Sequence, residues 1–420
     1  MKLRSAIFAS FLLLAPAAAN PAEAQVKLKT RTSIGVSDAT AVFGESVTLS
    51  ATVKLVTGGS PVGIVKFKDV TAGALLGSAP LDAKGVATLV VTSMKPGIHD
   101  IRGTFNGSAD QASSSGRARV VVRREYVVLG ADKGSLVIIL DARTHDEVFR
   151  FDAFPGFTGG VSVAATDMTD DFIPDIVVGA GTGGGSVVSV FDGSTGAPLR
   201  SFQAFPGFTG MVTVAAADVS ADGRADLIVA ASANGYVKVF DGVTGATIRS
   251  FFAFQGVTGA VSIAAADVNG DRAADLIVGA PLNGHVKVFD GSTTVLLKSF
   301  FAYPGFAGGV NVAAGDLDGD GVPEILTGAA STATHVNAFD ASSLALRASF
   351  LAYAGSSFGV RVSAADVNGD GRDDILTVPA APLAYVKAFD GPSLALLASF
   401  LLFDPPAGAG MFIAGSLWIQ

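Results

Sequence analysis

From about residue 124 onward, apolar and polar positions recur with a period of about 50 residues. Each unit opens with an apolar run such as VTVAA at 212–216, passes through an acidic loop and enters a second apolar run such as DLIVA at 226–230. A hairpin follows, of the form Val-Phe-Asp-Gly and then Ser-Phe-x-Ala-Phe. Short apolar runs bounded by turn residues predict strands, and this period indicates an array or a propeller of repeated sheets.

The number of repeats follows from how often the acidic loop and the hairpin aspartate each occur. The acidic loop occurs five times, whereas the hairpin aspartate occurs six times, at Asp141, Asp192, Asp241, Asp290, Asp340 and Asp390. The first unit lacks its first strand, and the run MFIAG at 411–415 has the missing pattern, with Leu417 in place of the leading loop aspartate. We therefore predict six four-stranded blades over residues 123–420, in which the C-terminal strand completes the first blade and closes the propeller.

The segment before the repeats has a different pattern. Residues 46–53, 63–67, 85–91, 99–105 and 117–122 form short, largely alternating runs separated by turn residues. About seven short strands within residues 29–122 predict a β-sandwich. The predicted fold class is therefore all-β, with a sandwich followed by a six-bladed β-propeller.

The five acidic loops share one frame, with oxygen-bearing side chains at offsets 0, 2, 4 and 8. Their leading aspartates lie 51, 49, 49 and 50 residues apart. Oxygen ligands at alternate positions can surround one hard cation, and a glycine at offset 5 permits the positive φ of a sharp turn. Asx-turns are the alternative, although an acid at offset 8 has no role in such a turn. The candidate ligand side chains are Asp167, Thr169, Asp171 and Asp175; Asp218, Ser220, Asp222 and Asp226; Asp267, Asn269, Asp271 and Asp275; Asp316, Asp318, Asp320 and Glu324; and Asp366, Asn368, Asp370 and Asp374.

Charge and composition exclude some classes of function. The chain has a net charge of −8, and 16 of its 37 acidic residues lie at these offsets, where self-repulsion favours a bound cation. The acidic balance argues against a nucleic-acid partner. The absence of cysteine excludes disulfides and thiolate metal sites. Four histidines without a paired context, and no Gly-x-Ser-x-Gly motif, give little support for catalysis, so we expect the protein not to be an enzyme.

The N-terminus predicts export. Lys2 and Arg4 precede an apolar run at 6–15, and Ala22-Glu23-Ala24 supplies an A-x-A cleavage site. This layout predicts a signal peptide over residues 1–24 with cleavage after Ala24, or alternatively after Ala19. No later run is long and apolar enough to predict a transmembrane segment. We therefore expect a secreted, extracellular or cell-surface protein. Because the chain shows no cell-wall sorting motif, released and attached forms both remain open.

Residues 29–122 resemble the bacterial Ig-like repeat family of group 3. The resemblance is carried by GESVTL at 44–49, PVGIVKF at 61–67, GVATL at 85–89 and KPGIH at 95–99. It implies a spacer or adhesive module of a surface protein.

The repeat region resembles the FG-GAP family of integrin α-subunit propellers and its bacterial VCBS-type relatives. The resemblance is carried by the five loops in register, GAP at 279–281 and FG at 358–359. It implies up to five structural Ca²⁺ ions, each tying the first strand of a blade to the second. It also implies a further backbone carbonyl ligand at offset 6, from Ile173, Arg224, Ala273, Val322 and Arg372. Phe172 and Arg272 depart from the pattern by replacing the turn glycine. We expect the loop at Asp316 to bind most tightly and the loop at Asp167 most weakly.

The same resemblance implies a ligand face opposite the cation loops, formed by residues 154–157, 181–185, 205–208 and 303–306. The alternative is that the aromatic residues of these segments fill gaps between blades. We expect non-catalytic recognition or adhesion, with an unidentified extracellular protein or glycan as ligand. A secreted, polysaccharide-active enzyme using the propeller floor and a lectin-like accessory protein are the alternatives. The hairpin at 240–245 also resembles the quinoprotein propeller repeat, but the only tryptophan, Trp418, does not supply the Trp that closes each of those repeats.

Overall fold

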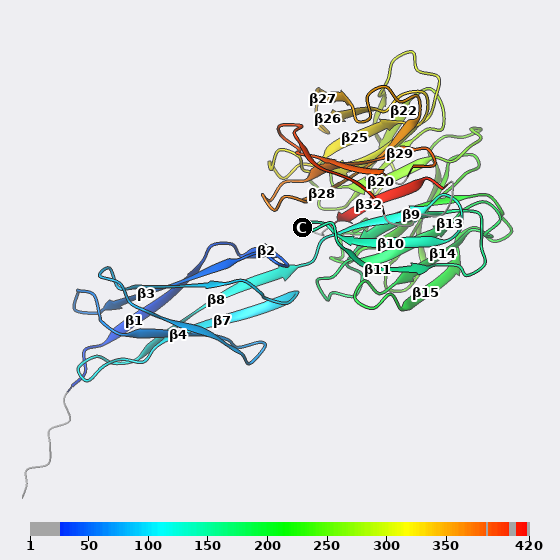
Figure 1. Cartoon of the computed structure of the whole chain (residues 1–420). Coiled ribbons are helices and arrows are strands. Elements are labelled where there is room, and N and C mark those ends of the chain that lie inside the picture. The colour runs from blue at the N-terminus through cyan, green and yellow to red at the C-terminus, as the bar shows by residue number, and fades with distance from the viewer. Residues whose placement is uncertain (1–25, 384, 403–408, 418–420) are drawn as a thin grey trace, which may run out of the picture. The chain divides into compact units, whose positions relative to one another are not determined.

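The computed structural model describes residues 26–383, 385–402 and 409–417, and within them it contains strands and turns but no helix (Figure 1). The predicted all-β class is therefore confirmed. The chain divides into two compact units, the first built from most of the residues before position 119 and the second mainly from the repeats. The domain boundary between residues 122 and 123 stays a prediction. The predicted signal peptide and Trp418 lie outside the described residues.

The strands before residue 124 form a three-stranded sheet in the order β1-β3-β6 and a five-stranded sheet in the order β2-β8-β7-β4-β5. Inward positions alternate with outward ones along β3, and Leu49, Phe67, Ile101 and Phe105 are completely buried. This arrangement is the predicted sandwich, with eight strands where about seven were expected. The strands are β1 (Thr30–Val36), β2 (Thr40–Val42), β3 (Val47–Leu55), β4 (Ile64–Asp69), β5 (Leu75–Pro80), β6 (Val86–Val91), β7 (Gly97–Phe105) and β8 (Ser114–Arg123).

The second unit repeats one four-stranded antiparallel meander. Five copies follow one another in sequence order. They are β12 (Val161–Thr166), β13 (Asp175–Ala180), β14 (Val187–Phe191) and β15 (Pro198–Gln203); β16 (Val212–Ala217), β17 (Asp226–Ala231), β18 (Tyr236–Phe240) and β19 (Thr247–Phe252); β20 (Ser262–Ala266), β21 (Asp275–Gly279), β22 (His285–Phe289) and β23 (Leu296–Phe301); β24 (Val310–Gly315), β25 (Glu324–Ala329), β26 (His335–Phe339) and β27 (Leu346–Leu351); and β28 (Gly359–Ala365), β29 (Asp374–Ala380), β30 (Tyr385–Phe389) and β31 (Leu396–Leu401).

The remaining copy combines the two ends of the repeat region. It contains β9 (Tyr126–Ala131), β10 (Leu136–Asp141), β11 (Glu147–Asp152) and the C-terminal strand β32 (Met411–Leu417). β32 pairs antiparallel with β9, from Met411 opposite Ala131 to Gly415 opposite Val127, and the two strands lie side by side in Figure 1. The predicted pairing of the C-terminal strand with the first repeat is thus confirmed. β32 also makes a short parallel pairing with β12, which joins two meanders into one eight-stranded sheet.

The innermost strands of the meanders contact one another in turn. β12 contacts β16, and the contacts continue through β20, β24 and β28 to β32, which returns to β12. Each interface between neighbouring sheets buries a cluster of aliphatic and aromatic side chains. Five of the clustered or adjoining aromatic residues come from the predicted ligand-face segments, namely Phe154, Phe205, Phe208, Tyr303 and Phe306. For these residues the packing alternative is confirmed.

All six innermost strands enclose a cavity of about 360 Å³ at the end remote from the acidic loops. Its lining includes one corresponding residue from each strand: Ser162, Thr213, Ser262, Asn311, Arg361 and Phe412. Five of the six are hydrogen-bonded to the next inner strand, over 2.7–3.0 Å. Ser162 donates to Val212 O, Thr213 to Val261 O, Asn311 to Val360 O and Arg361 to Met411 O, while Ser262 accepts from Val312 N. The sixth, Phe412, lies under the guanidinium of Arg361 at 4.0 Å. This belt of contacts joins neighbouring sheets at the centre of the unit.

Candidate metal centres

Each acidic loop joins the first and second strands of one meander. The leading aspartate directly follows the first strand, and the offset-8 acid is the first residue of the second strand. The offset-8 acids have at most 2% of their surface exposed; they are Asp175, Asp226, Asp275, Glu324 and Asp374. A strand boundary therefore places one buried carboxyl in every loop.

All five loops fold around two carboxylates. The leading aspartate accepts the offset-5 backbone N–H through Oδ2 at 2.7–2.9 Å, as from Gly321 to Asp316. The offset-4 aspartate accepts the offset-6 N–H at 2.8–3.0 Å, as from Val322 to Asp320. The bond between offsets 4 and 6 is that of an Asx-turn, so the turn alternative describes this part of the loop, whereas the bond between offsets 0 and 5 spans more residues than an Asx-turn does. The structure thereby places the five offset-6 residues at the end of the turn, and the role of their carbonyls stays a prediction.

The offset-8 acid has a different function in the loop. One of its oxygens accepts the offset-1 N–H at 2.9–3.1 Å, as from Val268 to Asp275. In four loops the other oxygen accepts the N–H of the residue after the hairpin aspartate at 2.9–3.2 Å, as from Gly291 to Asp275. The acid therefore connects the loop, the second strand and the hairpin turn, which a simple Asx-turn does not do.

The backbone of the loops is left-handed at two positions. At offset 5, φ is positive in all five copies, including 66° at Phe172 and 73° at Arg272, where glycine is replaced. These two loops were expected to depart from the pattern, and they do: a residue other than glycine adopts a left-handed conformation there, which costs free energy for an L-amino acid. At offset 3, φ is also positive, even at Asp170 and Ala221. The sequence did not predict this second position.

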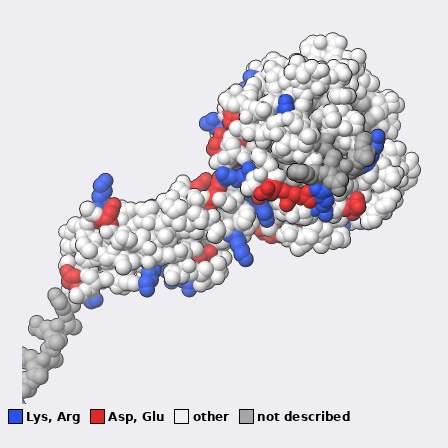
Figure 2. All heavy atoms as spheres, in the orientation of Figure 1, with Lys and Arg blue, Asp and Glu red and all other residues white. Residues whose placement is uncertain are grey.

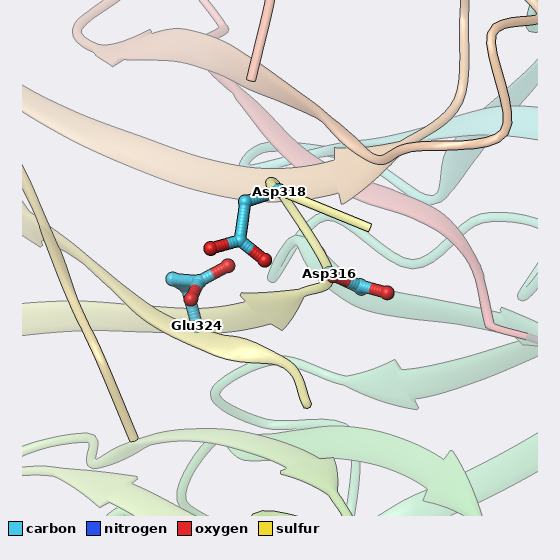
Figure 3. Close-up of side chains that lie close together, drawn as sticks. All are labelled: Asp316, Asp318 and Glu324. Carbon is cyan, nitrogen blue, oxygen red and sulfur yellow. The ribbon is translucent and has the colours of Figure 1, made fainter. Parts of the chain in front are cut away.

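Three carboxylates converge in the loop at Asp316. Oxygens of Asp316, Asp318 and Glu324 lie within 4.8 Å of one another, which no other three acids achieve in the described part of the chain (Figure 3). Figure 3 shows the carboxylates of Asp318 and Glu324 facing each other across the loop. This geometry suits one cation held by carboxylate oxygens.

In the loops at Asp267 and Asp366, acids converge on an amide. The Nδ2 of Asn269 lies 3.2 Å from Asp271, 3.3 Å from Asp275 and 3.5 Å from the hairpin aspartate Asp290. The Nδ2 of Asn368 lies 3.3–3.4 Å from the corresponding residues Asp370, Asp374 and Asp390. A donor group thus stands among carboxylates at the position where a cation would be coordinated.

The hairpin aspartates were predicted only as turn residues, and the structure adds a second role for some of them. They form longer turns than the Asp-Gly pair suggests, because the left-handed residue comes four positions later, as at Gly196 and Thr294. One oxygen of each accepts turn N–H groups, and in all but Asp141 it also accepts a hydroxyl, as Asp290 does from Thr293. The other oxygen faces the acidic loop in the meanders of Asp290 and Asp390. The sequence feature that could have predicted this second role is their recurrence in six copies, 15 to 17 residues after the offset-8 acid where a loop exists.

Burial changes the acidity of these groups. It raises the pKa of Asp175 to about 6 and the pKa values of Asp275, Glu324 and Asp374 to about 7. Hydrogen bonds from backbone N–H groups lower the same pKa values, but burial has the larger effect. Neighbouring loop carboxylates raise the same pKa values further. In contrast, hydroxyl and N–H donors hold the pKa values of Asp192, Asp241, Asp290 and Asp390 below the usual range. A buried acid of this kind takes up either a proton or a metal cation.

The donor set fits Ca²⁺. Every side chain at offsets 0, 2, 4 and 8 offers oxygen, and Ca²⁺ takes six to eight oxygen ligands, carboxylates and backbone carbonyls among them. The side chains at those offsets would hold the ion, with Asp290 and Asp390 within reach of two of the loops. When bound, the ion would neutralise the buried carboxylates and tie the loop to the second strand.

Most of the visible surface of the repeat unit is neither acidic nor basic, and its charged side chains occur in small mixed groups (Figure 2). Among the described residues there is also no helix with the length and hydropathy needed to cross a membrane.

Comparison with known proteins agrees with both units. The family model for the bacterial Ig-like domain of group 3 matches residues 34–123. The model for FG-GAP-like repeats matches residues 218–278 and 267–327, and the model for the FG-GAP repeat matches residues 358–391. No curated protein matches the chain.

Two solved structures are similar to the chain. One is a protein of unknown function from Bacteroides caccae, 11% identical, with a TM-score of 0.47 over 70% of this chain and 98% of that one. The other is Raptor from Chaetomium thermophilum, 14% identical, with a TM-score of 0.44 over 66% of this chain; the match spans 24% of Raptor. Neither similarity extends beyond general architecture.

The fold and the loops together define an all-β protein in which an Ig-like sandwich precedes a series of acidic-loop β-meanders. The chain contains FG-GAP repeats after an N-terminal bacterial Ig-like domain. FG-GAP repeats are typical of extracellular, adhesion-like proteins, which agrees with the predicted class.

Proposed function

We propose that this chain is an exported protein that acts in non-catalytic recognition or adhesion, and that Ca²⁺ bound in its acidic loops stabilises the repeat unit. The observation that carries the proposal is the common frame of the five loops. Each holds a buried offset-8 carboxyl at the start of a strand, bonded to the loop backbone. A cation shared by these acids and the loop would convert metal-binding energy into folding energy.

We infer the class of ligand from the domains that the chain contains, and not from a binding site. The Ig-like domain and the FG-GAP repeats support an extracellular protein or glycan as the ligand. The acids of the loops are bonded within the fold, and the aromatic segments opposite them are packed between sheets. Neither group therefore supports a catalytic role.

Calorimetric titration of the mature protein with Ca²⁺, combined with thermal melts in Ca²⁺ and in chelator, tests the metal part of the proposal. We expect uptake of three to five ions per chain and a clearly higher Tm in Ca²⁺. A matched control is Asp275→Ala, which removes an offset-8 acid and should remove one ion. No uptake together with identical melts would contradict the proposal.

Binding to panels of glycans and extracellular matrix proteins, measured in Ca²⁺ and in chelator, tests the recognition part. We expect binding that requires Ca²⁺ and leaves the ligand chemically unchanged. Release of products from a polysaccharide would instead establish an enzyme.

A further inference from the structure

The carboxylates of the loop at Asp316 contact an arginine from the fourth strand of the same meander. The guanidinium of Arg347 donates to Asp318 Oδ2 at 2.6 Å and to Asp340 Oδ2 at 2.6 Å, and its Nε lies 3.6 Å from Glu324 Oε1. Asp318 and Glu324 are two of the three acids that converge in the loop at Asp316. Arg347 therefore binds the carboxylates that a cation would need.

The position of Arg347 in its strand directs it into this loop. Arg347 is the second residue of β27 and lies seven residues after the hairpin aspartate Asp340. Side chains alternate between the two faces of a strand. Cations one position later in neighbouring meanders face away from their own loop and donate to hairpin carbonyls of the next meander. Arg200 donates to Val243 O, Arg249 to Gly291 O and Lys298 to Ser342 O.

Arg347 departs from the repeat pattern, and the acidic loop that it contacts departs from the pattern too. The residues at its position in the other meanders are all apolar: Val148, Leu199, Ile248, Leu297 and Leu397. The loop at Asp316 is also the one with a carboxylate at offset 2, where the other loops have Thr169, Ser220, Asn269 and Asn368. The extra negative charge and the extra positive charge thus occur in the same meander and contact each other.

Two of the three carboxylates that contact Arg347 correspond to carboxylates that contact an amide in another loop. Asn368 Nδ2 approaches the offset-8 acid Asp374 and the hairpin aspartate Asp390, as Arg347 approaches Glu324 and Asp340. An amide can rotate to present its oxygen to a metal ion. A guanidinium has no acceptor and must leave.

We propose that Arg347 is a built-in counter-ion of the loop at Asp316, so that this loop stays ordered without metal and binds a divalent cation only by displacing Arg347. This inference rests on the proposed Ca²⁺ binding by the loops. It makes the loop at Asp316 the weakest site of the five, because two of its carboxylates already have a cationic partner. That order reverses the one expected from the number of its acids.

Calorimetric Ca²⁺ titration and chelator melts of Arg347→Leu test the proposal, because leucine is found at this position in three other meanders. We expect the affinity of one site to rise by about tenfold or more, the other sites to stay unchanged and the Tm in chelator to fall. The matched control is Arg249→Leu, which removes a cation that contacts carbonyls only, and should leave Ca²⁺ uptake unchanged.

A second variant locates the effect. Asp318→Asn combined with Arg347→Leu gives this loop the side chains of the loop at Asp366 at offsets 0, 2 and 4, with Glu324 still in place of aspartate at offset 8, and it should titrate with the tighter sites. Uptake by the wild type with no gain in Arg347→Leu would overturn the role of Arg347 alone. No uptake by any of these proteins would overturn the proposed function and this inference together.

Discussion

At the scale of the residue, the loops depend on left-handed backbone at alternate positions. Glycine meets this need at offset 5 in three loops, with φ of 85° at Gly223, 86° at Gly321 and 83° at Gly371. Arg272 adopts the same conformation with a side chain, at 73°. The Oδ2 of Asp267 still accepts its N–H at 2.7 Å, so the hydrogen bond is kept at the cost of backbone strain.

Replacing Arg272 by glycine should therefore stabilise the protein. We expect Arg272→Gly to raise the free energy of unfolding by roughly 0.5–1 kcal/mol, because the relief of left-handed strain exceeds the added entropy of the unfolded chain. The converse variant Gly321→Ala should lose about 1 kcal/mol. Urea unfolding in Ca²⁺ measures both, and equal stability of Arg272→Gly and the wild type would show that position 272 stores no strain.

The sequence predicted the glycine position and its two exceptions, because a frame repeated five times makes each departure visible. It did not predict offset 3, where Asp170 and Ala221 are left-handed although neither is a glycine. It also did not predict the contacts of Arg347, because these depend on which face of β27 carries the side chain and on how the loop curls towards it.

At the scale of the element, one aromatic residue on the connection to each meander packs against the second strand of that meander. Tyr303 donates to Thr327 O and His335 O at 2.9 Å, and Thr327 Oγ1 donates back at 3.1 Å. Tyr353 and Thr377 repeat this arrangement one meander later. Where the connection has phenylalanine, as at Phe205, the second strand has valine, as at Val229. A hydroxyl on one partner is thus matched by a hydroxyl on the other.

A double-mutant cycle at this pair tests the matching. Tyr303→Phe should cost about 1–3 kcal/mol, because the buried Thr327 hydroxyl and the two carbonyls lose a partner. Thr327→Val should cost about 1 kcal/mol, since Tyr303 keeps its carbonyl acceptors. The double variant recreates the Phe–Val pair of other meanders and should lie within about 1 kcal/mol of the wild type. Additive losses, measured by urea unfolding, would show that the two side chains act independently.

The sequence allowed two roles for these aromatic segments, and the packing between sheets decides between them for the residues in buried clusters. The choice could not be made from composition, because a phenylalanine repeated at a fixed spacing is compatible with either ligand contact or packing. The decisive information is the depth of the connection between neighbouring sheets, which places Phe205 and Tyr303 among buried residues.

At the scale of the whole molecule, the C-terminal strand could be predicted because a repeat that lacks one strand and a chain end that supplies its pattern complement each other. The belt around the central cavity could not be predicted. It requires that Thr213 and its counterparts on the other inner strands reach the same height, which depends on register between sheets. Arg361 makes several contacts there, because it donates to Met411 O, stacks on Phe412 and pairs with Asp132 at 3.7 Å.

The summed acidity of the loops predicts how the whole repeat unit responds to pH. Burial raises the pKa values of Asp275, Glu324 and Asp374 to about 7, whereas unfolded carboxyls titrate near 4. Between these values the cation-free folded protein binds more protons than the unfolded chain, so its stability falls as pH rises. In chelator we expect the Tm to drop by about 5 °C or more from pH 5.5 to pH 7.5.

Calcium should reverse this trend. At pH 7.5 the loop acids are available to the ion, whereas at pH 5.5 protons compete for the same oxygens. The gain in Tm on adding Ca²⁺ should therefore be larger at pH 7.5 than at pH 5.5. Thermal melts at both pH values, each in Ca²⁺ and in chelator, measure the two effects together. A Tm in chelator that rises with pH would show that the buried acids are ionised without a cation. An equal gain at both pH values would place Ca²⁺ binding away from Asp275, Glu324 and Asp374.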